Sequence, residues 1–124
     1  MAYVGIQTML LAYKMRKSDK EFELMQITEK RLAETRNQTK VSQEYIDAKS
    51  ELDKDDPNYA EDYKELEAQY NIDLAEIAEM EDELDTKKAS AESEIAYLNN
   101  YIESWQSALQ QNVGKAHQYG AQSS

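Results

Sequence analysis

The chain has one strong helix breaker near its middle and almost none elsewhere. Pro57 is the only proline among 124 residues, and no glycine lies between Gly5 and Gly114. Because proline and glycine are the residues that interrupt helices most strongly, each half of the chain can continue as one long helix. The two halves meet in the segment LDKDDPNYAEDY, residues 52–63. This distribution predicts an all-α fold built from two long helices.

The segment around Pro57 is expected to form a turn rather than a kink. Proline fits the first position of a helix, where its missing N–H is not needed, and Asp56 can cap that helix. A short connection between two long helices folds them back antiparallel. We therefore expect a long antiparallel two-helix hairpin, a coiled coil completed by oligomerisation, with its turn at Asp55, Asp56 and Pro57.

The boundaries follow from the same features. The hairpin is expected to occupy residues 1–113 as a single domain. Helix 1 is expected at about 3–52, the turn at about 53–57 and helix 2 at about 57–113. Residues 114–124, GKAHQYGAQSS, contain glycine and serine without apolar periodicity, which indicates a C-terminal tail.

Both helices carry apolar residues at heptad spacing, which is typical of coiled coils. In the first helix the predicted seam contains Leu11, Ser18, Met25, Leu32, Thr39 and Ile46, with Met15 and Phe22 between them. In the second helix the seam repeats every seventh residue as Tyr63, Tyr70, Ile77, Leu84, Ala91, Leu98 and Trp105. Its partners three or four residues on include Leu66, Leu74, Met80, Ile95, Ile102 and Leu109. Four apolar residues, including the partner Leu74, lie partly off these seams: Leu24, Ile27, Ile72 and Leu74.

A turn centred near residue 55 places residue i opposite about 110 − i, which predicts the pairing of charges. Residues 1–52 carry nine Lys and Arg against eight Asp and Glu (+1), and residues 53–124 carry five against seventeen (−12). The register sets Lys30 and Arg31 near residues 79–83, and Lys20 near residues 91–94. Exposed ion pairs contribute about 0.5 kcal/mol each, so the apolar seam is expected to dominate.

The composition also excludes several classes of function. The formal net charge of −11 argues against binding to nucleic acids, which needs a basic surface. No cysteine is present, so no disulfide or thiolate site can form. The first fifteen residues are apolar but lack the basic region and cleavage site of a signal peptide. They are also too short to span a membrane.

No constellation of catalytic residues is evident, and we expect neither enzymatic activity nor a cofactor. The densest acidic run, residues 79–85, lacks the glycine and alternating ligands of a calcium loop, so a solvated helix face is expected and no metal site. His117 is the only histidine and falls in the expected tail. It is expected to be a solvated residue, and it cannot supply the histidines of a di-iron bundle or a catalytic triad.

The end of the hairpin that holds both termini is the predicted assembly interface. Eleven of the first fifteen residues are Met, Ala, Tyr, Val, Ile or Leu, and one partner helix cannot cover them all. The expected interface consists of Val4, Ile6, Met9, Leu10, Leu98, Tyr101, Ile102, Trp105 and Leu109. The tyrosine and tryptophan stripe of the second helix fits packing inside the hairpin and contact with another protein equally well.

This pattern resembles the helical-hairpin subunits of secreted filaments. The antiparallel helices, the absence of cysteine and the apolar terminal end are similar to the needle, filament and inner-rod subunits of type III secretion systems. They are also similar to the terminal helices of flagellins. DDPNYAED resembles the proline-bearing turn of needle subunits, which carries over Pro57 alone. The resemblance implies export, assembly, and contact with a secretion apparatus or chaperone.

Two functions are therefore expected from the sequence. The first is a structural, self-assembling protein, a subunit of a filament or helical oligomer, exported without a cleaved signal. The second is a cytosolic coiled-coil adaptor or chaperone that binds a different protein through its tyrosine-rich face. Leaderless secretion or a cell-surface location is favoured over the cytoplasm, on the resemblance.

Overall fold

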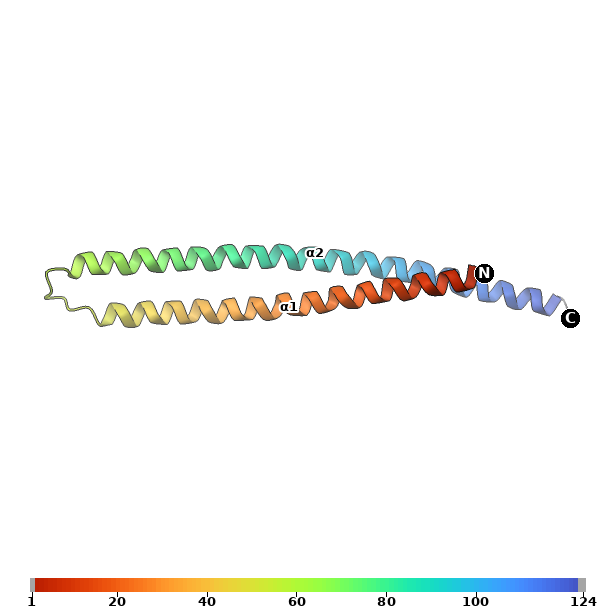
Figure 1. The fold of residues 1–124 in the computed structure, drawn as a ribbon, viewed down its shortest axis with the longest axis horizontal. Helices are drawn as coiled ribbons and strands as arrows, with labels where there is room; N and C mark the ends of the chain where they lie inside the picture. The colour runs from red at the N-terminus through yellow and green to blue at the C-terminus, as the bar shows by residue number, and fades with distance from the viewer. Residues whose placement is uncertain (1, 123–124) are drawn as a thin grey trace. The chain divides into compact units, whose positions relative to one another are not determined.

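The protein is an all-helical hairpin. The computed structural model describes the backbone of residues 2–122 and the side chains of residues 4–114. Helix α1 spans Ala2–Ser50 and helix α2 spans Tyr59–Gln122. The helices pack against each other in antiparallel directions (Figure 1). The predicted fold class, an all-α antiparallel two-helix hairpin, is confirmed.

The chain divides into two compact units, each of which pairs one segment of α1 with one segment of α2. Residues 1–25 and 89–124 form the first, called here the terminal unit because it contains both ends of the chain. Residues 26–88 form the second, called here the turn unit because it contains the connection between the helices.

The connection is built from two successive turns that use the same device. The carboxylate of Asp53 accepts a hydrogen bond from the Asp55 N–H at 3.0 Å, and its carbonyl accepts one from the Asp56 N–H at 3.1 Å. Asp56 repeats this pattern with the Asn58 N–H at 2.9 Å and the Tyr59 N–H at 3.0 Å. A short aspartate side chain bonds readily to the backbone two residues on. The two aspartates therefore reverse the chain without glycine.

Pro57 lies within the second turn and is not the first residue of α2. It occupies the second position of that turn, where its fixed φ angle is favourable. The first helical hydrogen bond of α2 runs from the Asp62 N–H to the Asn58 carbonyl at 2.9 Å, so the helix begins at Tyr59. The predicted start of α2 at about residue 57 is therefore two residues early. The Asp56 carboxylate does accept a hydrogen bond from the N–H two residues on, as a helix cap does, but within the turn that directly precedes the helix.

The other helix ends also differ from the predicted ones. Helix α1 ends at Ser50 because the Leu52 N–H bonds the Lys49 carbonyl, only three residues back, at 3.3 Å. Helix α2 continues to Gln122, so the prediction of a non-helical tail from residue 114 is wrong for residues 114–122. A glycine inside a helix costs only about 1 kcal/mol relative to alanine. Gly114 and Gly120 therefore do not suffice to end a helix of this length.

The seam predicted for α2 is the buried one. Its central positions are between 2% and 5% exposed and belong to Ile77, Leu84, Ala91 and Leu98. In the terminal unit, Ile6 and Leu10 of α1 pack with Ile102 of α2, and Tyr13, Trp105, Ala108 and Leu109 surround them. In the turn unit, Ile27 of α1 is buried with Ile77 and Leu84. Met80, predicted as a seam partner, is 44% exposed, and Glu81 takes that place beside α1.

The seam predicted for α1 is wrong, because its residues lie on the solvent-exposed side of the helix. Leu11, Met15, Phe22, Met25, Leu32 and Ile46 are all more than half exposed. The buried heptad is shifted along the chain and includes Ile6, Leu10, Tyr13, Leu24, Ile27, Val41, Tyr45 and Ala48, all buried or half-buried. Helix α1 thus has two apolar stripes with the same repeat, and only one faces α2.

Polar residues on the inner stripe explain which of the two stripes α2 covers. In the terminal unit, Lys20 Nζ lies 3.1 Å from a Glu94 carboxylate oxygen. In the turn unit, Arg31 Nη1 lies 2.8 Å from Glu81 Oε2, and its Nε lies 3.5 Å from Asp85. The basic residues of the inner stripe therefore lie beside carboxylates of α2. The other stripe of α1 has no basic residue at the corresponding positions.

The register is displaced by a few residues from the predicted one. Tyr13 stacks on Tyr101 in the terminal unit, and Tyr45 stacks on Tyr70 in the turn unit. The residue numbers in these pairs sum to 13 + 101 = 114 and 45 + 70 = 115, against the predicted 110. The first turn of α2 reaches past the last turn of α1 (Figure 1). Because the start of α2 is offset from the end of α1, residues equally distant from the midpoint of the connection do not lie opposite each other.

Candidate interaction face

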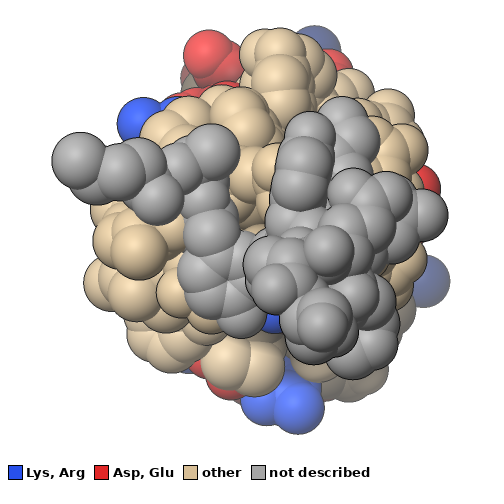
Figure 2. Space-filling view, turned by 90° about the vertical axis from the view of Figure 1, so that its right-hand side faces the viewer, with Lys and Arg blue, Asp and Glu red and all other residues tan. Residues whose placement is uncertain are grey.

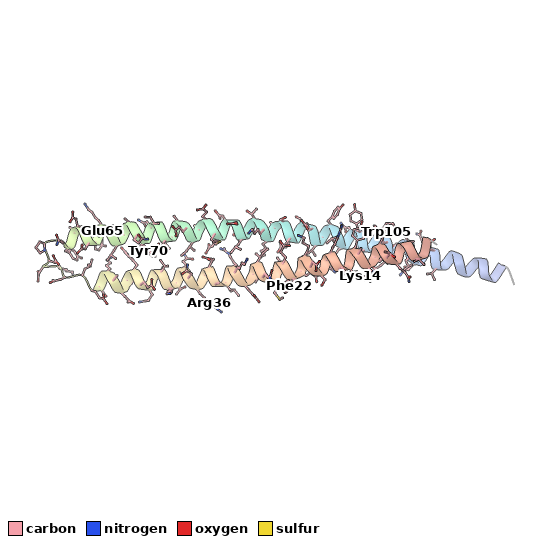
Figure 3. The ribbon with its side chains drawn as sticks, in the orientation of Figure 1. Lys14, Phe22, Arg36, Glu65, Tyr70 and Trp105 are labelled. Carbon is pink, nitrogen blue, oxygen red and sulfur yellow. The ribbon has the colours of Figure 1, made fainter. Side chains whose placement is uncertain are left out.

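The strongest candidate for a functional surface is the exposed stripe of α1 in the terminal unit, called here the outer stripe. Each of its apolar side chains is between 53% and 63% exposed: Val4, Leu11, Met15, Phe22 and Met25. Figure 3 shows Phe22 on the side of α1 that faces away from α2. No described residue of the terminal unit covers these side chains fully, although all five are of the kind that proteins bury.

The spacing of the outer stripe is that of a second coiled-coil seam. Leu11, Met15, Phe22 and Met25 are separated by four, seven and three residues, which are heptad steps. At about 100° per residue, this stripe points in roughly the opposite direction to the inner stripe of α1. Contiguous exposed apolar residues of this kind usually mark a surface that another chain covers.

Charged residues flank the outer stripe on one side. Lys14 and Glu21 are one heptad apart, and both are exposed. Lys17 Nζ lies 3.7 Å from Glu21 Oε1 in a long ion pair, and the Glu21 side chain remains 54% exposed. Lys14 makes no ion pair within the described part of the chain. Both charged groups are therefore accessible to a partner that packs on the stripe.

The predicted assembly residues fall into three groups by burial. Four are buried in the hairpin and present little surface: Ile6, Leu10, Leu98 and Ile102. Tyr101, Trp105 and Leu109 are half-buried, whereas Val4 and Met9 are exposed. Viewed from the end that carries the termini, most of the surface not drawn in grey is uncharged, with charged side chains near the rim (Figure 2). The accessible part of the predicted interface is therefore continuous with the outer stripe at Val4.

The tyrosines of the terminal unit whose side chains the structure describes, Tyr13, Tyr97 and Tyr101, contact one another. The rings of Tyr13 and Tyr101 stack with centroids 5.2 Å apart. The Tyr97 hydroxyl donates to the Tyr101 hydroxyl at 2.7 Å, and the two rings meet edge to face. That hydrogen bond, together with partial desolvation, raises the pKa of Tyr97 above its usual value. Among these three described tyrosines, Tyr97 alone is more than half exposed.

A second aromatic cluster lies beside the connection, in the turn unit. Tyr45 stacks on Tyr70 with centroids 4.3 Å apart, and the Tyr70 and Ser42 hydroxyls are 3.0 Å apart. Figure 3 shows Tyr70 on the side of α2 that faces α1. The Lys49 ammonium lies 4.9 Å from the centre of the Tyr63 ring, and its contact with Tyr63 raises the pKa of Lys49. An open groove of about 870 Å³ borders this cluster. These contacts fasten the end of α1 to the start of α2.

Three of the five carboxylates in the acidic run, residues 79–85, make ion pairs. Glu81 and Asp85 both contact Arg31 across the hairpin, and Glu83 pairs with Lys87 at 3.2 Å along the helix. Among the side chains that the structure describes, no group of three or more His, Asp or Glu residues could hold a metal ion. The side chain of His117 lies outside the described ones.

Sequence reasoning identified the residues of the outer stripe but assigned them to the wrong side of α1. The signal that distinguishes the stripes is charge. Lys20 and Arg31 interrupt the inner stripe and meet Glu94 and Glu81. In the terminal unit the outer stripe is interrupted by Ser18, which is uncharged and cannot form an ion pair with a carboxylate of α2.

The structure and these contacts define the class of protein as an α-helical hairpin with an additional exposed seam. Comparison with protein families, with curated proteins and with solved structures finds no match to this chain. The likeness to secreted filament subunits therefore rests on the pattern of residues alone. No helix in the described part of the chain has a segment long and apolar enough to cross a membrane.

Proposed function

We propose that this chain is a structural protein that associates with copies of itself, as a subunit of a helical oligomer or filament. The observation that carries the proposal is the outer stripe: five large apolar side chains at heptad spacing, each more than half exposed. A helix with one apolar stripe can bury that stripe against the other helix of a two-helix hairpin. A helix with two apolar stripes needs a further partner to bury the second one.

The energetics favour weak contacts that are repeated. Full burial of a Leu, Met or Phe side chain stabilises by about 1.5–3 kcal/mol. Each residue of the outer stripe is already about half covered, so its further burial contributes ~1 kcal/mol, or ~10 kcal/mol for five residues on each of two chains. Loss of translational and rotational freedom costs about 4–15 kcal/mol. One such contact is therefore expected to be weak, and a stable assembly needs more than one.

The alternative function, an adaptor that binds through a tyrosine-rich face, has less support. Tyr13 and Tyr101 stack on each other within the terminal unit, so little of that face is free for another protein. An adaptor would stop at a small, defined oligomer until its partner is added, whereas a filament subunit would form very large species as its concentration rises.

Sedimentation velocity over a wide concentration range tests the proposal, with negative-stain microscopy to identify filaments. The double variant Leu11→Gln/Phe22→Gln removes two residues of the outer stripe without touching the buried seam. It is expected to remain monomeric at concentrations where the unmodified chain associates. The matched control is Ile72→Gln/Met80→Gln, which removes two exposed apolar residues of α2 outside the stripe and is expected to associate normally.

The location of the contact is tested by a second pair of variants. Asp55→Ser/Asp56→Ser changes the connection and is expected to leave the size distribution unchanged. Trp105→Ala is less informative, because Trp105 packs on the buried residues Ile6, Leu10 and Ile102 and its loss weakens the hairpin itself. Association that survives loss of the outer stripe but not the change at the connection would show that the interface lies at the other end.

A further inference from the structure

Each residue of the outer stripe can be assigned to a heptad position. These positions specify how a second copy of the chain can pack on the stripe. This inference rests on the proposed self-association. Met15 and Phe22 occupy one core position, and Leu11, Ser18 and Met25 occupy the other. Lys14 and Glu21 then occupy the flanking position on one side of the seam. Ala12 and Asp19 occupy the flanking position on the other side.

We propose that the outer stripe is covered by the outer stripe of a second copy running in the opposite direction, with Leu11 packed on Phe22 of the second copy and Lys14 paired with Glu21 of the second copy. In an antiparallel coiled coil each core position faces the other kind of core position, and each flanking position faces its own kind. Two-fold symmetry repeats every contact, so two Lys14–Glu21 ion pairs form. Met15 packs beside Ser18 of the second copy at the centre.

The charges select this register over its neighbours. Sliding the second copy by one heptad in one direction brings Lys14 against Lys14. Sliding it the other way brings Glu21 against Glu21 and Asp19 against Asp19. Each of these shifts replaces two attractive contacts by contacts between like charges, which destabilise a coiled coil. Only the register centred between residues 16 and 17 joins opposite charges.

A parallel arrangement is disfavoured by the continuation of the same heptad along α1. Parallel packing also offers an attractive contact, from Lys14 to Asp19 of the second copy. However, the core position that Met15 and Phe22 occupy is next occupied by Glu29 and Arg36. In parallel packing each would face its own copy in the core. In the antiparallel register Glu29 instead lies at the margin of the contact, opposite Val4.

The antiparallel contact is isologous, so it closes at two copies. The same patch is used on both chains, and no free patch of this kind remains after pairing. A dimer formed in this way is the unit from which a larger assembly would grow. A filament therefore needs a second contact on another surface of the chain.

Charge exchange tests the pairing. Lys14→Glu and Glu21→Lys are each expected to raise the dimer dissociation constant about fivefold, because two exposed attractive pairs become repulsive. The double variant Lys14→Glu/Glu21→Lys is expected to return it to within about twofold of the original value. In a parallel dimer the double variant would not recover, because the new carboxylate at position 14 would face Asp19. Absence of rescue overturns the antiparallel register.

Cysteine cross-linking gives an independent measurement, since the chain has no cysteine of its own. An equimolar mixture of Lys14→Cys and Glu21→Cys chains is expected to form mixed disulfide dimers under mild oxidation, while either variant alone forms few. Leu11→Cys alone is the control for parallel packing, in which position 11 faces itself. Rapid cross-linking of that single variant would overturn the proposal.

The outcomes also separate this inference from the proposed function. If the chain stays monomeric at every accessible concentration, both the proposed function and the antiparallel pairing are wrong. The outer stripe would then be a binding surface for a different protein. A chain that dimerises through Leu11 and Phe22, but without rescue by charge exchange, supports the proposed function and rejects the antiparallel pairing alone.

Discussion

At the scale of single residues, the seam of this hairpin is notable for its charged members. Arg31 lies on the inner stripe of α1 and reaches both Glu81 and Asp85 of α2, and its pKa is raised, chiefly by the hydrogen bond with Glu81. Such a residue contributes little net stability. Arg31 does destabilise other registers between α1 and α2, in which its cation would face an apolar or basic residue. Its main effect is therefore to select the register.

We expect the loss of Arg31 to be costly only when its carboxylate partners are left without a cation. Arg31→Ala is expected to lower the free energy of unfolding, because Glu81 and Asp85 lose their cation. Arg31→Met/Glu81→Met is expected to be close to neutral, because both members of the close pair are replaced by apolar side chains that fill the seam. Arg36→Ala, at an exposed position, is the matched control. Urea unfolding at low protein concentration measures all three, and equal losses for Arg31→Ala and the double variant would contradict this account.

The ion pairs of Lys20 predict a dependence of stability on alkaline pH. Hydrogen bonds to Glu23 first, and to Glu94 second, raise the pKa of Lys20 above its ordinary value of 10.5. A raised pKa in the folded state stabilises the fold below the unfolded value, and this contribution is lost as pH rises through the folded value. The difference in melting temperature between the unmodified chain and Lys20→Met should therefore shrink above pH 10.5. A difference that grows with pH would show the opposite sign of linkage.

At the scale of the helix, α1 has two apolar stripes that are equivalent in repeat and different in role. The inner stripe holds the hairpin together, and the outer stripe is available to a partner. Ile27 and Leu32 illustrate the contrast within the turn unit, since Ile27 is 5% exposed and Leu32 is 54% exposed. The two positions are only five residues apart on the same helix.

Substitutions at these two positions are expected to act on different properties. Ile27→Ala should lower the free energy of unfolding by about 2 kcal/mol or more, as removal of a buried isoleucine usually does. Leu32→Ala should change it by less than about 0.5 kcal/mol in the isolated chain. Chemical denaturation monitored by circular dichroism compares them. A larger effect at Leu32 would mean that α2 packs on the stripe that this structure leaves exposed.

The same contrast explains how much of the fold could be predicted from the sequence. The hairpin and the seam of α2 were predictable, because a lone proline separates two unbroken helices and α2 has one dominant heptad through Ile77 and Leu84. The face of α1 was not, because two heptads compete there. The choice depends on Arg31 meeting Glu81 from the other helix, which local periodicity does not contain. The extension of α2 beyond Gly114 was missed because one glycine penalises a helix only slightly.

At the scale of the whole molecule, the net charge of −11 opposes association. Most of the excess lies in residues 53–124, with a balance of −12, whereas residues 1–52 are nearly neutral at +1. An interface built from α1 of both copies therefore brings together the less charged helices. The remaining repulsion is between acidic surfaces at longer range, where salt screens it effectively.

Self-association is consequently expected to strengthen with ionic strength. Between about 0.02 M and 0.5 M NaCl, the Debye length falls from roughly 20 Å to roughly 4 Å, so repulsion is screened while apolar burial persists. Sedimentation velocity at fixed protein concentration should show a larger average size at the higher salt concentration. A smaller size would indicate that the exposed ion pairs, and not the apolar contacts, hold the copies together.

The placement of both chain ends in one unit has a mechanical consequence. Tension applied to the two ends acts across the seam and separates it one layer at a time. The first layer to part is the one formed by Ile6, Leu10 and Ile102, and separation then proceeds into the terminal unit. Because each layer resists alone, the hairpin yields at low force, as a zipper does. Tension that entered along one helix and left along the other in the opposite direction would instead load the seam in shear, in which many contacts must break together.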